Sequence, residues 1–423
     1  MKEKNRWLIA LSAVAIHTSI GSAYAYSVFQ NPLSESLGWE STQVSLAFTI
    51  AIFILGISAA AFGQFVEKQG PRKSAFLAAI LFASGIIGSG IAVNLESLPM
   101  FYLTYGVLSG MGLGLGYISP VSTLVKWFPD RRGLATGMAV FGFGAGALIA
   151  GPVAAQLIGS VGIATTFFIL GSMYFLFMSL GALYIAKPPV GWAPKGMDPG
   201  TVSGGKYDIK GTKDLAQLTA KEASKTKRFW LLWVMMFINI STGLMLISVA
   251  SPMAQEKVGM TAIAAASMVG FMGLFNGGGR IGWSSASDFI GRSRIYPMFF
   301  AIQIVAFLIL PNITNVVVFQ ILIFLVLTIY GGGFAVLPAF IGDLFGTKQL
   351  GAIHGLILTS WSMAGVMGPQ LVAYIRESTN SYNLTFYVFV GFLAIAFITS
   401  LLMMKDIKKI QALKEKKLVE KAS

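Results

Sequence analysis

Long apolar runs separated by short polar segments make up most of this chain. A run of about 20 predominantly apolar residues is long enough to cross the hydrocarbon core of a bilayer as an α-helix. The sequence contains twelve such runs, at residues 7–30, 43–65, 74–94, 98–123, 133–158, 163–186, 229–251, 261–283, 294–312, 315–343, 350–375 and 383–404. The pattern predicts an all-α integral membrane protein with twelve transmembrane helices.

The longest polar stretch, residues 187–228, is rich in Pro, Gly, Ser and Lys and separates six predicted spans from six. Within it, residues 213–226 fit a short amphipathic helix on the membrane surface, although a solvated linker is the simpler interpretation. The predicted domains are an N-terminal six-helix bundle at 1–186, a cytoplasmic linker at 187–228, a C-terminal six-helix bundle at 229–404 and a basic cytoplasmic tail at 405–423.

Composition agrees with this interpretation and explains the net charge. The 423 residues are 55% hydrophobic and 11% charged, whereas soluble domains carry about 25% charged residues. All but three of the 31 Lys and Arg residues fall on one predicted side of the membrane, the exceptions being Lys257, Arg376 and Arg280. The positive-inside rule therefore places both termini in the cytoplasm of a multi-pass cell-membrane protein, and the charge of +14 needs no nucleic-acid partner. The absence of cysteine excludes disulfides, thiolate nucleophiles and cysteine metal sites.

An internal repeat relates the two halves. At an offset of 218 residues, PVSTLVKWFPDRRGLATG (120–137) aligns with PAFIGDLFGTKQLGAIHG (338–355), which pairs Pro120 with Pro338, Gly133 with Gly351 and Gly137 with Gly355. GQFVEKQGPRK (63–73) likewise matches SSASDFIGRSR (284–294) in its acid, glycine and base. Two related six-helix halves are typical of secondary transporters.

These motifs carry a family resemblance. The 63–73 stretch is similar to the loop 2–3 signature of the major facilitator superfamily, with Ser284 replacing the usual glycine in the second copy. KWFPDRRGLATG (126–137), FNGGGRIGWSSASDFIGR (275–292) and GDLFGT (342–347) resemble the oxalate:formate antiporter family, which is related to the monocarboxylate transporters. The resemblance runs through all twelve spans and implies transport of small carboxylates by alternating access, with no cofactor.

One arginine stands inside a predicted span, in the stretch GLFNGGGRIGW (273–283). A charge at a helix centre costs roughly 3 kcal/mol in membrane insertion, so Arg280 needs a stabilising partner. Every Asp and Glu falls in a predicted loop or at a helix end, which leaves two interpretations: backbone carbonyls loosened by Gly277–Gly279 surround the guanidinium, or a substrate carboxylate binds it through two parallel hydrogen bonds. Asn276, one turn earlier on the same face, is expected to bond the anion or orient the guanidinium.

Five aromatic residues complete the expected binding site: Tyr24, Tyr117, Tyr330, Phe334 and Trp361. The resemblance implies that aromatics matching the first four line the cavity; ordinary packing or anchoring at the membrane interface is the alternative for each. Trp361, 18 residues after Asp343, stands where the oxalate-transporting member has a lysine. A dianion would then face one cation instead of two, and one charge at 4 Å is worth about 4 kcal/mol at an effective dielectric of about 20. We therefore predict a monocarboxylate such as lactate, pyruvate, formate or acetate, and not oxalate.

Coupling and gating candidates are also present. His17, about ten residues into the first span, is a candidate carrier of a coupled proton, although a simply hydrogen-bonded histidine is the alternative. His354 begins the eleventh span and is expected to act at a gate or cap. The resemblance implies that four loop residues hold the outward-facing state through charge and helix-dipole contacts; the alternative is a solvated loop that only orients the chain. These four are Glu67, Arg72, Asp288 and Arg292.

The sequence thus predicts a monomeric secondary active transporter for a small monocarboxylate, with a proton or a counter-anion as the coupled species. Carboxylate:carboxylate antiport and a non-transporting carboxylate sensor are the alternatives. An enzyme is disfavoured because no His, Asp, Cys or Glu constellation has catalytic spacing. A sodium or other metal site is not expected, since the predicted spans offer no carboxylate ligands.

Overall fold

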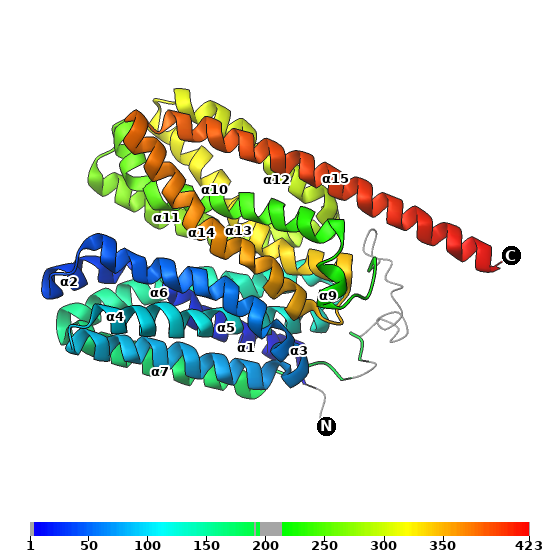
Figure 1. The fold of residues 1–423 in the computed structure, drawn as a ribbon, viewed down its shortest axis with the longest axis horizontal. Coiled ribbons are helices and arrows are strands. Elements are labelled where there is room, and N and C mark those ends of the chain that lie inside the picture. Colours follow the sequence, from blue (N-terminus) through cyan, green and yellow to red (C-terminus); the bar gives the residue numbers. More distant parts are fainter. Residues whose placement is uncertain (1–3, 190–191, 195–213, 423) are drawn as a thin grey trace. The chain divides into compact units, whose positions relative to one another are not determined.

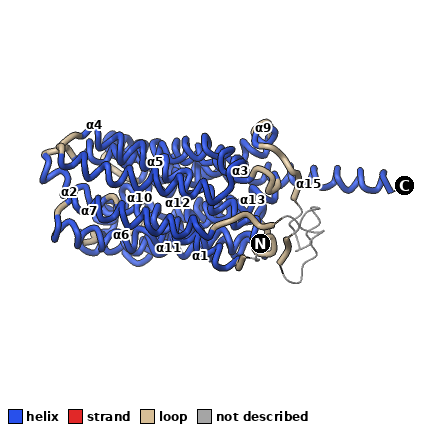
Figure 2. Tube along the Cα trace, turned by 90° about the horizontal axis from the view of Figure 1, so that it is seen from below, coloured by secondary structure: helices blue, strands red, loops and turns tan. Residues whose placement is uncertain are grey.

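The computed structural model describes residues 4–189, 192–194 and 214–422. The described residues are almost entirely helical and contain no strand, which confirms the all-α prediction (Figure 2). The helices form two compact units. Unit 1 comprises Met1–Pro189 and Gly351–Val366, and unit 2 comprises Val190–Leu350 and Met367–Ser423. The predicted domain boundaries at 186 and 229 stay a prediction.

Unit 1 begins with a broken first span: the helix continues as a short 3-10 turn and then a second helix. Its elements are α1 (Arg6–Gly21), η1 (Ser22–Ala25), α2 (Ser27–Leu37), α3 (Ser41–Asn94), α4 (Leu98–Phe101), the π-helix η2 (Tyr102–Leu108), α5 (Ser109–Trp127), α6 (Arg132–Val161), α7 (Ile163–Tyr184) and the first half of α14 (Leu350–Thr379). The 54-residue α3 is interrupted at Gly70, whose φ of 81° and ψ of 170° are not helical. Glycine tolerates this positive φ, and Pro71 follows it, so α3 is two helices that correspond to the predicted spans 43–65 and 74–94.

Unit 2 contains the remaining helices, which Figure 1 colours from green to red. They are α9 (Ala220–Ala223), α10 (Lys227–Val258), α11 (Ala262–Ile290), α12 (Arg292–Ile309), the 3-10 turn η3 (Leu310–Asn312), α13 (Val316–Phe345), the second half of α14 and α15 (Asn383–Ala422). Helix α15 continues well past the predicted end of the last span at residue 404, so the described part of the basic tail is helical (Figure 1).

The C-terminal part of the linker differs from the solvated segment that the sequence favoured. The backbone N–H groups of Leu215 and Leu218 donate to the carbonyls of Asp343 and Phe345 at 2.7 and 2.8 Å. The following α9 is only four residues long and begins with a capping box of Thr219 and Glu222. Residues 214–226 are therefore tied to the end of α13, whereas residues 195–213 of the linker lie outside the described residues.

Ten helices in the described part of the chain are long and apolar enough to cross a membrane. Because α3 covers two predicted spans, these ten correspond to every predicted span except that of α11. Helix α11, which contains Asn276, Arg280 and Asp288, forms as predicted.

Candidate functional site

The sequence-predicted site residues fall into two groups, one in each unit. In unit 2, Arg280 is completely buried on α11, and its Nε–H donates to Oδ1 of Asn276 at 3.2 Å. The hydroxyl of Ser284, one turn later, donates to the Arg280 carbonyl. A guanidinium has five N–H donors, and the bond from Nε fixes the plane in which the terminal fork lies. Asn276 and Arg280 therefore lie on one face of α11, as the spacing of four residues predicted.

Two aromatic side chains of α13 lie beside this arginine. The Arg280 Cζ is 5.7 Å from the ring centroid of Phe334, and the Phe334 ring meets that of Tyr330 edge to face at 5.4 Å. Both rings are fully buried. The quadrupole of the Phe334 ring attracts the guanidinium at this distance, and the dry surroundings strengthen any ionic contact that the arginine makes.

Glycines allow these residues to approach. A Cβ on Gly331 would lie 2.1 Å from the carbonyl oxygen of Asn276 and 2.5 Å from its Oδ1. A Cβ on Gly243 of α10 would lie 2.1 Å from the Tyr330 ring. The run YGGGF (330–334) therefore brings the backbone of α13 against α11 at the level of Asn276.

A second buried arginine of unit 2, Arg292, pairs with two carboxylates. Arg292, only 4% exposed, bonds Asp288 on α11 and Asp343 on α13, the latter at 2.7 Å. This three-residue charge cluster joins the ends of three helices within unit 2, because Arg292 itself begins α12. Its predicted gating role stays a prediction.

In unit 1 the predicted residues gather around one aromatic ring. The centroid of Tyr117 on α5 lies 5.1 Å from His17, 5.7 Å from His354 and 5.5 Å from Trp361. Tyr24, in η1, contacts this group through Phe143 of α6 at 4.9 Å. All these side chains except the half-buried Tyr24 are buried.

Phe143 is the residue that sequence reasoning missed. Its ring contacts those of Tyr117 at 5.5 Å and Trp361 at 5.8 Å, in addition to His17 and Tyr24. The internal repeat contained the signal, because an offset of 218 residues places Phe143 on Trp361. Residues that occupy equivalent positions in the two halves are thus in ring contact.

The two histidines differ in their hydrogen bonds. His17 Nδ1 lies 2.8 Å from the Ala139 carbonyl, and Nε2 lies 3.1 Å from the Tyr117 carbonyl. Neither ring nitrogen of the buried His354 has a hydrogen-bond partner among the described residues. His354 lies within the second turn of α14, whose N-cap is Gln349, so it does not cap that helix. Its gating role stays a prediction.

Glu67 on α3 connects three segments of unit 1. Its carboxylate accepts from Lys126 Nζ at 2.9 Å and from the N–H of Gly351, in the first turn of α14, at 2.8 Å. Lys187 donates to the Glu67 backbone carbonyl at 2.7 Å. Partial burial, followed by the charge of Lys126, lowers the pKa of Lys187. Arg72 is exposed just beyond Gly70.

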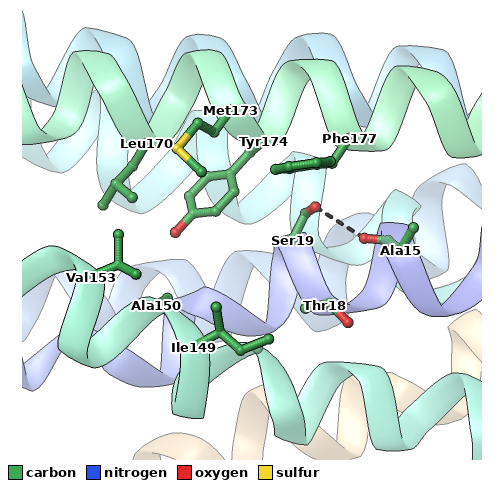
Figure 3. Close-up of a pocket in the computed structure, with 11 residues that line it drawn as sticks. Ala15, Thr18, Ser19, Ile149, Ala150, Val153, Leu170, Met173, Tyr174 and Phe177 are labelled. Atoms are coloured by element: carbon green, nitrogen blue, oxygen red, sulfur yellow. Dashed lines mark hydrogen bonds between the residues drawn. The ribbon is translucent and has the colours of Figure 1, made fainter.

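A cavity of about 300 Å³ lies between α1, α6 and α7 of unit 1 (Figure 3). Its walls are mainly apolar, and the Tyr174 hydroxyl and the Ser19 hydroxyl, which donates to the Ala15 carbonyl, are among its few polar groups. Ile149 and Phe177 at its rim are exposed. The cavity includes none of the predicted binding residues and resembles a lipid-facing groove.

The helical architecture, with ten long apolar helices in the described part of the chain, is that of a multi-span membrane protein. Comparison with known proteins gives the family. The chain matches the Major Facilitator Superfamily over residues 11–369, with a further match over residues 279–422. It belongs to this superfamily and is therefore a transporter rather than an enzyme.

Three similarities define its relatives further. The chain is 29% identical over 400 residues to the oxalate:formate antiporter of Oxalobacter formigenes, covering 93% of this chain and 91% of that protein. It is 24% identical over 394 residues to monocarboxylate transporter 13 of Rattus norvegicus, covering 92% and 86%. The structure of the proton:xylose symporter XylE superposes with a TM-score of 0.76 at 15% identity, covering 96% and 98%, and shows the same fold. The resemblance to the antiporter family is thereby confirmed.

Proposed function

We propose that this protein is a secondary active transporter that moves a small monocarboxylate of the lactate, pyruvate, formate or acetate class across the cell membrane. Alternating access supplies the movement, and Arg280 holds the carboxylate. The observation that supports this is a completely buried guanidinium on α11, oriented by Asn276 and placed beside the Phe334 ring. A planar fork of N–H donors matches the two oxygens of a carboxylate, and a lysine ammonium does not.

The preference for a monocarboxylate rests on Trp361. This side chain is fully buried and packs edge to face with Tyr117 and Phe143, so the position contributes an indole ring and no charge. A second carboxylate on the substrate would then lack a second cation, which costs about 4 kcal/mol at an effective dielectric of about 20. Tyr24, Tyr117, Tyr330 and Phe334 are proposed as further substrate contacts.

We propose a proton as the coupled species and His17 as its carrier. We further propose that the protein is a monomer and that both of its termini lie in the cytoplasm. Exchange of one carboxylate for another is the second candidate. It is favoured by the similarity to the oxalate:formate antiporter of Oxalobacter formigenes over almost the whole chain.

Ligand binding by the purified protein tests the proposal. Lactate, pyruvate, formate, acetate and oxalate are titrated by calorimetry against wild type, Arg280→Ala and Trp361→Lys. We expect a monocarboxylate to bind wild type, Arg280→Ala to abolish that binding, and Trp361→Lys to gain affinity for oxalate. Arg376→Ala is the matched control, because Arg376 is a partly exposed arginine of unit 2 that pairs with Glu256 at 2.8 Å.

The outcomes separate the roles. Binding that survives Arg280→Ala makes this arginine structural and removes the basis of the site. In liposomes, uptake of the bound monocarboxylate distinguishes a transporter from a sensor. Uptake that requires a carboxylate inside the liposome and does not depend on a pH gradient identifies exchange of one carboxylate for another.

A further inference from the structure

The contacts of the two His17 ring nitrogens bear on its protonation state. Both ring nitrogens lie within hydrogen-bonding distance of backbone carbonyl oxygens, those of Ala139 on α6 and Tyr117 on α5. A carbonyl oxygen only accepts, and a neutral imidazole carries one N–H, so a neutral ring satisfies one of these contacts. Only the imidazolium, with an N–H on each nitrogen, donates to both.

The surroundings of His17 also favour a cation. The Tyr117 ring stacks on the imidazole at 5.1 Å with only 18° between the ring planes, so the negative face of the tyrosine covers the histidine. Gly142 of α6 makes the approach possible, because a Cβ there would lie 3.2 Å from the His17 Cβ. Among the described residues, the titratable side chains that reach the His17 ring directly or through one neighbouring ring are Tyr117, His354 and Tyr24. On the side of α7, Gly181 packs against α1.

His354 offers the opposite environment against the same tyrosine. Its ring centroid lies 5.7 Å from that of Tyr117, the side chain is fully buried, and neither nitrogen has an acceptor among the described residues. Protonation would add a second N–H donor without an acceptor, and an unsatisfied buried donor costs about 1–3 kcal/mol. It would also place two like charges against one tyrosine ring.

We infer that His17 and His354 form a single-proton site around Tyr117, in which His17 is the imidazolium and His354 stays neutral. Loading forms one N–H bond on His17 with a proton from water, and release breaks that bond and frees one carbonyl contact. The coupling role of this site rests on the proposed function: one proton carried with one monocarboxylate makes each transport cycle electroneutral.

The experiment uses the fact that the chain contains only two histidines. Protein labelled with ¹⁵N-histidine, with its affinity tag removed, is reconstituted in liposomes, and its imidazole nitrogens are observed by solid-state NMR near pH 7. His17→Gln and His354→Gln each remove the signals of one histidine, so the signals that remain belong to the other. Either variant, provided that it folds, is enough to assign both histidines. We expect two protonated nitrogens for His17 and one protonated with one unprotonated nitrogen for His354. A neutral His17, or two imidazolium rings, overturns the inference.

Proton movement tests the coupling role separately. With the bound monocarboxylate in liposomes that contain a pH dye, we expect wild type to acidify the lumen on uptake. His17→Gln should lose this net uptake and keep exchange of internal for external substrate, because exchange needs no proton release. Loss of both activities makes the His17 role structural. Uptake by wild type without acidification overturns proton coupling, whatever the protonation state of His17.

Discussion

Gly331→Ala tests whether the close contact of α13 with α11 orients the arginine. The added methyl would lie 2.1 Å from the Asn276 carbonyl oxygen, whereas nonbonded atoms prefer separations of about 3.5 Å. The helices must therefore separate by roughly 1.4 Å, or Asn276 must move away. Because Gly331 lies inside helix α13 without a positive φ, any loss comes from this collision and not from backbone strain.

The size of the effect on stability and on substrate affinity follows from three terms. Overpacking of a close contact costs about 1–3 kcal/mol, and the better helix propensity of alanine returns up to about 1 kcal/mol. Displacing Asn276 also removes a hydrogen bond to a charged group, worth about 1.5–3 kcal/mol. If Asn276 orients Arg280 for the carboxylate, substrate affinity should fall by roughly ten- to a hundredfold.

Calorimetry with the best monocarboxylate and thermal unfolding in the same detergent measure both effects. Gly278→Ala is the matched control, since Gly278 is two residues from Arg280 and a Cβ there would meet nothing within 4 Å. We expect the control to keep wild-type affinity and stability or gain slightly in stability. Equal substrate affinities in Gly331→Ala and Gly278→Ala would refute the orienting role of this contact.

Three further predictions concern stability, each measured by thermal or denaturant unfolding. Arg292→Met leaves the carboxylates of Asp288 and Asp343 without their arginine and should cost about 3–5 kcal/mol of stability. Arg376→Met, at a partly exposed pair with Glu256, should cost less than about 1 kcal/mol, and similar losses for the two variants would contradict the buried-pair argument. Glu67→Gln keeps an acceptor for the Gly351 N–H and should destabilise the protein less than Glu67→Ala. Equal losses of stability in the two variants would mean that only the ion pair with Lys126 matters. Phe143→Ala removes a fully buried ring that contacts four aromatic residues and should cost about 3 kcal/mol or more; a smaller loss than for Phe143→Leu would contradict its central place.

Much of the fold was determined by local sequence patterns. Each span is specified by about 20 neighbouring apolar residues, because the thickness of the bilayer alone sets that length. The relation between Asn276 and Arg280 was equally local, since residues four apart on a helix share a face, and the structure joins them at 3.2 Å. The solvated linker predicted from composition was wrong for its C-terminal part, because composition does not reveal that the amides of Leu215 and Leu218 bond carbonyls at the end of α13.

The tertiary structure decided which distant residues meet. His17 and Ala139 are 122 positions apart, and no periodicity within either helix indicates that a carbonyl of one faces the ring of the other. The same holds for Phe143, whose place among four rings depends on the packing of α6 against α1, α5 and the first half of α14. Hydrophobic length and spacing fix what each helix is and which of its residues share a face. Close packing between helices, limited by side-chain volume and by glycines such as Gly142 and Gly331, fixes which faces touch.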